Sequence, residues 1–113
     1  MAQDFESTIT KNIDASLVDI RPTADGDDAI VGIRLVNVSD TVQITVDVAI
    51  TNDAADTITG YIIKNAPIPV GSSLELIDGG SKIVLMSGNK LQAKSSATDS
   101  LDVIVSAVGD IST

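Results

Sequence analysis

The chain has 113 residues, which is the size of one domain with a single hydrophobic core. It contains neither cysteine nor histidine, which excludes a disulfide framework, thiolate metal sites, a thiol nucleophile and the most common general base. The formal net charge is −9, and one Tyr and one Phe are the only aromatic residues. Nucleic acid is therefore not an expected partner, because its phosphates would be repelled and its bases would find no stacking surface.

Targeting and membrane segments are not expected either. The initial sequence MAQDFESTIT has no basic segment and no apolar segment, so we predict no signal peptide. The mean hydropathy is +0.29, but the apolar runs are short and alternate with polar residues, so we predict no membrane span. The lack of cysteine fits a reducing compartment.

The apolar residues are mostly β-branched, with 15 Ile and 12 Val against 7 Leu. Such side chains fit a pleated sheet better than a helix, and the composition therefore predicts an all-β chain. The first strand is expected at residues 17–20, where Arg21-Pro22 ends it. The second is expected at residues 29–38. Its predicted inward-facing residues are Val31, Ile33 and Leu35.

Residues 42–50 give the clearest strand signal. Apolar and polar residues alternate strictly from Val42 onward, which is typical of a half-buried antiparallel strand whose inner face begins at Val42. The sequence NVSD at residues 37–40 predicts the turn before it, because Asn, Ser and Asp side chains bond to their own backbone.

The second half of the chain contains five more predicted strands, at residues 61–64, 73–77, 82–86, 91–94 and 101–108. Pro67 and Pro69 lack N–H donors, so the segment that contains them must lie on a sheet edge or at a bend between sheets. Residues 78–80 (DGG) predict a hairpin turn, and residues 87–89 (SGN) predict another turn. We therefore predict one antiparallel β-sandwich over residues 1–113, with seven to eight short strands in jelly-roll or Ig-like order.

The N-terminal residues 1–12 admit two interpretations. They are polar but carry Phe5 and Ile9, and the lack of helix formers argues against a helix. One interpretation is an extended arm that adds a strand to the open edge of a neighbouring subunit. The other is that Phe5 covers one end of the chain's own core.

One acidic loop is a candidate metal site. The sequence ADGDDA brings three carboxylates together, and Ca²⁺ prefers oxygen ligands. Calcium loops require a further ligand and then glycine, but Ala29 and Ile30 occupy these positions. A solvated turn is the favoured interpretation, and we predict no bound metal and no cofactor. The residues of the calcium alternative are Asp25, Asp27 and Asp28.

The remaining polar and aromatic residues suggest no chemistry. Asp53 and Asp56 form a second acidic loop, again interpreted as a turn. Lys64 and Lys82 are interpreted as charges that protect sheet edges from aggregation. Tyr61 is expected in the core with its hydroxyl at the rim. We therefore predict no catalytic residue and no enzymatic activity.

Motifs in the second half of the sequence resemble a known family. They are a strand ending in lysine, PIPVGSSL at residues 67–74, GGSKIVL at residues 79–85 and LDV at residues 101–103. In these features the chain resembles small virion structural proteins of tailed bacteriophages, especially phages of marine and cyanobacterial hosts. Upstream, GIRLVNVSDTVQITVDVAI is similar to the family's paired strands, so the likeness covers about residues 29 to 111.

The resemblance implies a non-enzymatic structural component of a bacteriophage virion, first of all a capsid decoration (cement) protein that binds and stabilises the particle. Its partners would be other virion proteins, either the major capsid protein or neck and tail proteins, in virions assembled in the host cytoplasm. A neck, tail or fibre protein is one alternative. A carbohydrate-binding adhesin module is another.

A small sandwich has open edges, so we also expect a homo-oligomer, with a trimer as the first guess. The expected partner-binding residues are Phe5, Ile9, Pro67 and Pro69.

Overall fold

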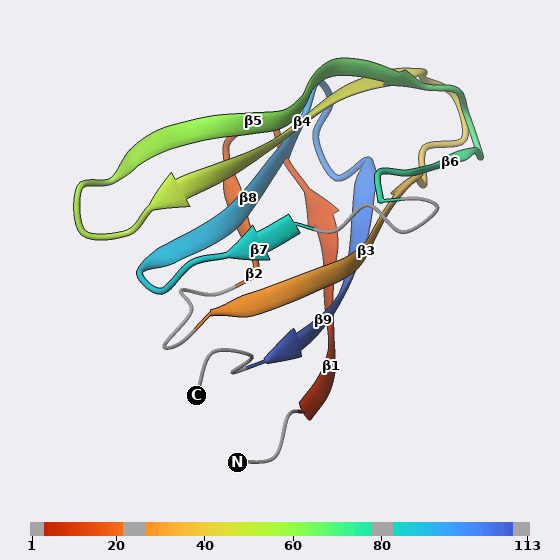
Figure 1. Cartoon of the computed structure of the whole chain (residues 1–113). Helices are drawn as coiled ribbons and strands as arrows, with labels where there is room; N and C mark the ends of the chain where they lie inside the picture. Colours follow the sequence, from red (N-terminus) through yellow and green to blue (C-terminus); the bar gives the residue numbers. More distant parts are fainter. Residues whose placement is uncertain (1–3, 22–26, 78–82, 110–113) are drawn as a thin grey trace.

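The computed structural model describes residues 4–21, 27–77 and 83–109, and regular structure within these ranges is entirely β-strand (Figure 1). The strands are β1 (Asp4–Ile13), β2 (Val18–Arg21), β3 (Asp28–Asn37), β4 (Ile44–Asn52), β5 (Thr57–Ile68), β6 (Ser73–Glu75), β7 (Ile83–Leu85), β8 (Asn89–Ser95) and β9 (Leu101–Gly109). The all-β prediction is confirmed. The described ranges contain nine strands instead of the predicted seven or eight, and the strand without a sequence counterpart is β1.

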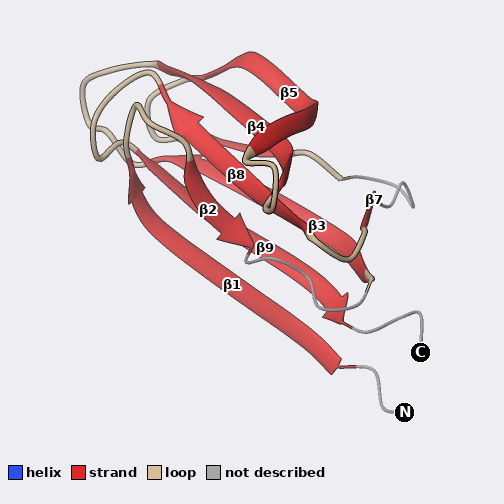
Figure 2. Ribbon diagram, turned by 90° about the vertical axis from the view of Figure 1, so that its left-hand side faces the viewer, coloured by secondary structure: helices blue, strands red, loops and turns tan. Residues whose placement is uncertain are grey.

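The strands form two antiparallel sheets that pack face to face (Figures 1 and 2). One sheet has the order β1-β9-β3-β6, with β7 also paired to β3, and the other has the order β2-β8-β4-β5. The chain thus resembles one long hairpin that has been rolled up, because β4 pairs with β5, β3 with β6 and β7, β2 with β8, and β1 with β9. This is the jelly-roll order, and it decides between the two topologies that the sequence left open.

The hydrophobic core lies between the sheets and is aliphatic. Alternate residues of β9 are 0–1% exposed, as the sequence pattern predicts. No core residue among the described side chains is aromatic. The prediction that Tyr61 lies in the core is wrong: it is 44% exposed on the edge strand β5, opposite Ala49 of β4, and the Lys64 Nζ atom lies 4.4 Å from its ring centroid.

A β-bulge in β3 decides which of its side chains face the core. Val31 is an extra residue between Ile30 and Gly32, which lie opposite consecutive residues of β9. Ile30 is therefore buried at 0% exposure, whereas Val31 is 37% exposed. The prediction that Val31 faces inward is wrong for this reason, and the same prediction for Ile33 and Leu35 is confirmed.

The predicted NVSD turn is confirmed, and it carries the chain from one sheet to the other. The buried Asn37 side chain accepts the Ser39 N–H and donates to the carbonyls of Val42 and Ile68, each over 2.9 Å. Ser39 Oγ accepts the Val42 N–H at 3.1 Å. These bonds hold Val42 in the loop, so the prediction that it begins the inner face of the next strand is wrong, and β4 begins at Ile44.

The predictions for the prolines are confirmed. Pro67 lies in β5, at the edge of its sheet. Pro69 follows β5 and accepts a hydrogen bond from the Ser72 N–H (3.1 Å) in the bend that leads to the other sheet.

The predicted hairpin between β6 and β7 is wrong. Both strands pair antiparallel with β3, β6 at Arg34–Val36 and β7 at Asp28–Ile30, so they follow one another along the same edge of β3. Residues 78–80 and Lys82 lie outside the described residues. The turn predicted at residues 87–89 is confirmed, because Gly88 has a φ of 89° and the Asn89 N–H donates to the Met86 carbonyl (3.0 Å).

The bulge in β3 generates a paired stability test. We expect Ile30→Ala to lower the free energy of unfolding by about 2–5 kcal/mol, because it leaves a cavity in the core. Val31→Ala should stay within about 0.5 kcal/mol, because Val31 faces solvent. Urea denaturation measures both variants. A larger loss for Val31→Ala than for Ile30→Ala would contradict the assigned bulge.

A second test concerns two carboxyl groups at the sheet ends. Asp14 Oδ1 accepts the Asp99 backbone N–H (3.2 Å), and a hydrogen bond and charge repulsion from the Asp14 carboxyl raise the pKa of Asp99. A raised carboxyl pKa stabilises the fold in acid, and this contribution is lost as the pH rises through the folded-state pKa. We therefore expect Asp99→Asn to raise the Tm at neutral pH and to leave it unchanged below the ordinary Asp pKa of about 3.9.

The matched control is Asp56→Asn, because Asp56 has nearly the same backbone, with φ of 51° against 54° for Asp99. Asn tolerates a positive φ well, so this control measures how much of the Tm gain comes from backbone preference alone. Thermal melts at neutral and acidic pH compare the variants. An equal gain for both substitutions would show that backbone preference, not charge repulsion, is responsible.

Candidate assembly surfaces

A buried arginine joins the two sheets at one end of the sandwich. Arg21 Nη2 lies 3.0 Å from Asp28 Oδ2, and Arg21 Nη1 lies 2.7 Å from Glu6 Oε1. The side chains of Arg21 and Asp28 are 8% and 7% exposed, and that of Glu6 is 45% exposed. Since β2 belongs to one sheet and β1 and β3 to the other, the guanidinium links both sheets.

A register shift in β2 places Arg21 in this position. Asp19 lies opposite Gln92 and Arg21 opposite Leu91, so Ile20 is an extra residue and both Ile20 and Arg21 are buried. Burial alone would lower the pKa of Arg21, but hydrogen bonds to two carboxylates and their charges outweigh it and raise this pKa. The guanidinium therefore stays charged. Regular alternation of a strand does not predict two consecutive inward residues, so the sequence did not indicate this cluster.

The candidate calcium loop is partly occupied by protein contacts. Asp28 is bound by Arg21, and Asp27 Oδ1 accepts the Ser87 N–H at 3.0 Å. The interpretation as a solvated turn is wrong for Asp28, which is 5% exposed. Asp25 lies outside the described residues. Within the described ranges no three acidic side chains are placed to hold a metal ion. That this loop binds no metal stays a prediction, with calcium as its alternative.

The second acidic loop is the solvated turn that the sequence predicts. Its residues from Asp53 to Asp56 are exposed, and the Asn52 side chain accepts the Ala55 N–H at 2.9 Å. Asp53 Oδ1 lies 3.1 Å from the Lys90 Nζ atom.

The predicted partner-binding residues lie on two different sheet edges. Ile9 lies on β1 and is 64% exposed, more than any other large apolar side chain described. Phe5 also lies on β1, opposite Val108 of β9, but its side chain is outside the described set. Pro67 lies on β5 at the far edge of the other sheet, and Pro69 lies in the bend just after it. The structure therefore does not bring these four residues together.

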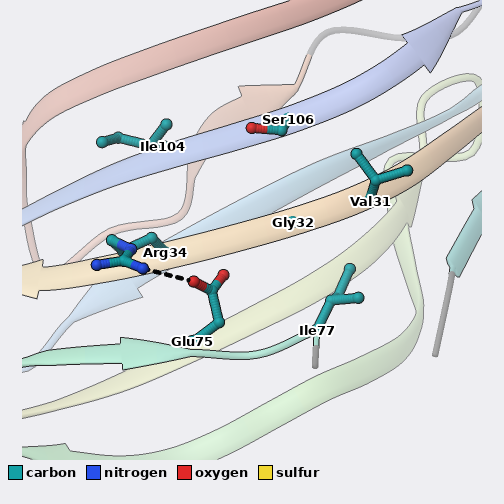
Figure 3. A pocket seen from close by; sticks show the side chains of 7 residues that line it. All are labelled: Val31, Gly32, Arg34, Glu75, Ile77, Ile104 and Ser106. Carbon is teal, nitrogen blue, oxygen red and sulfur yellow. Dashed lines mark hydrogen bonds and ion pairs between the residues drawn. The ribbon is translucent and has the colours of Figure 1, made fainter. Parts of the chain in front are cut away.

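The outer face of the β1-β9-β3 sheet carries a shallow hollow of about 430 Å³ (Figure 3). Val31, Ile77 and Ile104 form its apolar part. The lack of a side chain at Gly32 deepens its centre, because a Cβ atom there would have no neighbour closer than 3.8 Å. Arg34 and Glu75, 2.9 Å apart, form its polar rim. Ile9 lies opposite Ile104, so apolar side chains continue from the hollow to the free edge.

A second hollow, of about 370 Å³, lies on the outer face of the other sheet and is polar. The buried Asp47 carboxylate there accepts the Asn65 N–H at 2.8 Å and lies 3.7 Å from the Lys94 Nζ atom. Lys64 also lines it and is exposed on the edge strand β5, as predicted. Asp47 and Lys94 thus form an ion pair within the hollow, and the Lys64 Nζ atom lies over the Tyr61 ring.

No family model matches the chain, and no curated protein matches it. Solved structures show the same fold. A chain of the T13 viral particle of IBDV has a TM-score of 0.53 and 9% identity over 94% of this chain, which spans only 31% of that chain. A chain of the Bacillus endospore appendages, which are disulfide-linked pili, has a TM-score of 0.55 and 13% identity over 98% of this chain and 88% of its own.

A pentameric capsid protein from metagenomic phage sequences aligns with 95% of this chain and 62% of its own, with a TM-score of 0.45 and 13% identity. A protein of a viral particle, that of IBDV, is thus among the neighbours that share the fold. The narrower likeness to proteins of marine and cyanobacterial phages has no support from these comparisons. No helix able to cross a membrane occurs in the described part of the chain.

The Arg21 cluster generates a test of what joins the sheets. We expect Arg21→Met to lower the free energy of unfolding by about 3–5 kcal/mol, because it removes the cation beside a buried carboxylate. The control is Arg34→Met, which breaks the exposed pair with Glu75 and should cost about 0–1 kcal/mol. Chemical denaturation measures both. Equal losses would mean that the Arg21 pair is no more important than a surface ion pair.

Proposed function

We propose that the chain is a non-enzymatic structural component of a bacteriophage virion, most specifically a capsid decoration protein that binds the particle surface. The observation that carries the proposal is an uncovered apolar surface, with Ile9, Val31 and Ile104 exposed on the outer face of a jelly-roll sheet. Jelly rolls recur in viral capsids, and uncovered apolar surface on a sheet marks a contact with another protein.

The character of the two hollows supports a structural role. Both are open and shallow. Arg34 and Glu75 form an ion pair in the first hollow, Asp47 and Lys94 form one in the second, and Lys64 of the second contacts the Tyr61 ring. Every buried side-chain polar atom in the described ranges has a hydrogen-bond partner. Catalytic sites usually hold perturbed, unsatisfied groups in a cleft, which is a different arrangement.

The proposed partners are other virion proteins, either the major capsid protein or neck and tail proteins, together with further copies of this chain. The proposed location is the virion, assembled in the host cytoplasm. A neck, tail or fibre protein is the alternative within the same class. The likeness to the appendage chain favours a role in an extended assembly, but this chain has no cysteine for disulfide links.

An adhesin module that binds carbohydrate is the less favoured alternative. It requires a face of exposed aromatic side chains or of Asp and Asn loops, for which the acidic loops 25–28 and 53–56 are the candidates. Tyr61 is the one exposed aromatic among the described residues. Its ring already contacts Lys64.

Copy number tests the proposal. Quantitative mass spectrometry of purified particles should find the chain in hundreds of copies per particle if it decorates the capsid. A few to a few dozen copies would indicate a neck or fibre position instead. Absence of the chain from purified particles, with free chain in the lysate, would overturn the virion role. Binding of purified protein to particles that lack it provides the control for contamination.

A further inference from the structure

The sheet edges of this sandwich differ greatly in how well they are protected. β2 has four residues and a register shift, and β6 and β7 have three residues each. β5 is long, but its pairing with β4 shifts register three times, and Pro67 removes a donor. Short strands, bulges and prolines are the devices by which proteins prevent strands from pairing with other chains.

β1 carries none of these devices over most of its length. From Asp4 to Thr10 it lies opposite seven consecutive residues of β9 without a shift, and the first irregularity comes between Thr10 and Ile13. It contains no proline. Figure 2 shows β1 at the outer edge of the sandwich, next to β9. Its other side has no strand partner within the described ranges, so a long regular ladder is left open there.

The Arg21 cluster keeps β1 in its own sheet. Glu6 is paired with Arg21 at 2.7 Å, and Arg21 Nη1 also lies 3.4 Å from Thr8 Oγ1. A neighbouring molecule therefore meets a fixed strand edge, not a detached arm. This differs from the interpretation of residues 1–12 as an arm that leaves the subunit.

We infer that two copies of this chain associate through their β1 strands, which pair antiparallel across a two-fold axis and join two sheets into one. The partner is a second copy because the edge of β1 is the one long, regular edge in the described part of the chain. Association with any other edge of a copy would meet a short, bulged or proline-containing strand. An edge that can pair only with itself forms a closed two-fold dimer. This contact does not produce the trimer that the sequence suggested.

The charges along β1 favour the same partner. Each copy carries a net charge of −9, so two copies repel one another over most of their surface. Residues 7–11 of β1 contain no carboxylate, and they include Lys11. In an antiparallel pair, Lys11 of each copy lies toward the end of the other β1 that carries Glu6. Glu6 is already paired with Arg21, and the antiparallel orientation keeps the Glu6 side chains of the two copies apart, whereas an in-register parallel pair would set them side by side.

The apolar side chains on the outer face continue across such a contact. Ile9 lies on the edge strand and Ile104 lies opposite it on β9. Pairing of the two β1 strands places both isoleucines of each copy beside the seam. Ile9, which is 64% exposed in the single chain, then packs against side chains of the second copy.

Sedimentation velocity on the full chain tests this inference. We expect a concentration-dependent dimer, and Ile9→Lys should weaken it about tenfold or more by placing two charges at the seam. The matched control is Val84→Lys on β7, which is exposed to a similar degree at 47% but lies at the opposite edge of the sheet. This control should leave the dimer intact. A melting curve of each variant verifies that it is folded.

Cysteine cross-linking supplies an independent measurement, because the chain has no cysteine of its own. Single cysteines are introduced at residues 7, 8, 9 and 10 and, as a control, at Val84. A two-fold antiparallel ladder places one of the four β1 positions opposite itself, and mild oxidation should link that variant into dimers far faster than its neighbours.

Three results would overturn the inference: a monomer at high concentration, a trimer, or an oligomer that Ile9→Lys leaves unchanged and that no β1 cysteine links. None of them bears on the copy number in particles. Failure of the edge contact is therefore distinguishable from failure of the proposed virion role.

Discussion

The Arg21 guanidinium joins the two sheets where the aliphatic core ends, and the arrangement of that end of the sandwich depends on it. Its carboxylate partners come from β1 and β3, which lie on either side of β9. Glycine at the end of β9 fits closely here, because a Cβ atom at Gly109 would lie 3.2 Å from Glu6 Oε2 and 3.7 Å from Asp28 Oδ1 and would require the Glu6 carboxylate to shift. The guanidinium is thus buried at modest cost because two strands, β1 and β3, supply its partners and β9 leaves room between them.

The absence of aromatic residues from the described core has consequences for how this protein meets others. Contacts between proteins usually depend on a few large aromatic or arginine side chains in pockets. The described surface offers Tyr61 alone among aromatics. The hollow around Gly32 is shallow, and its arginine, Arg34, is paired with Glu75. Binding must therefore rely on extended shape, on aliphatic surface and on the backbone groups of sheet edges. Assemblies with many identical copies suit such weak contacts, because each contact is repeated many times.

The sequence predicted the fold class, most strands and the turns whose side chains bond to the backbone. Alternation in residues 101–108 and the NVSD turn were decisive, because local periodicity and local hydrogen bonds are readable from a short window. What could not be predicted depends on register. The inward side chain of Ile30 and the buried Arg21 both follow from bulges, and a bulge is set by pairing with a distant strand. β1 was missed as part of the sheet because its polar residues give no alternation on their own.

The unequal protection of the sheet edges and the acidic surface together determine through which edge two copies of the chain associate. A chain with a net charge of −9 repels its own copies, and this repulsion suppresses contacts that lack a specific attraction. The bulges and Pro67 of β5 remove the regular ladder that would have overcome the repulsion at that edge. Residues 7–10 of β1 combine open backbone groups with a lack of carboxylates, so attraction between two copies exceeds repulsion there first. The same acidic charge that keeps copies apart in solution thus directs association to one edge.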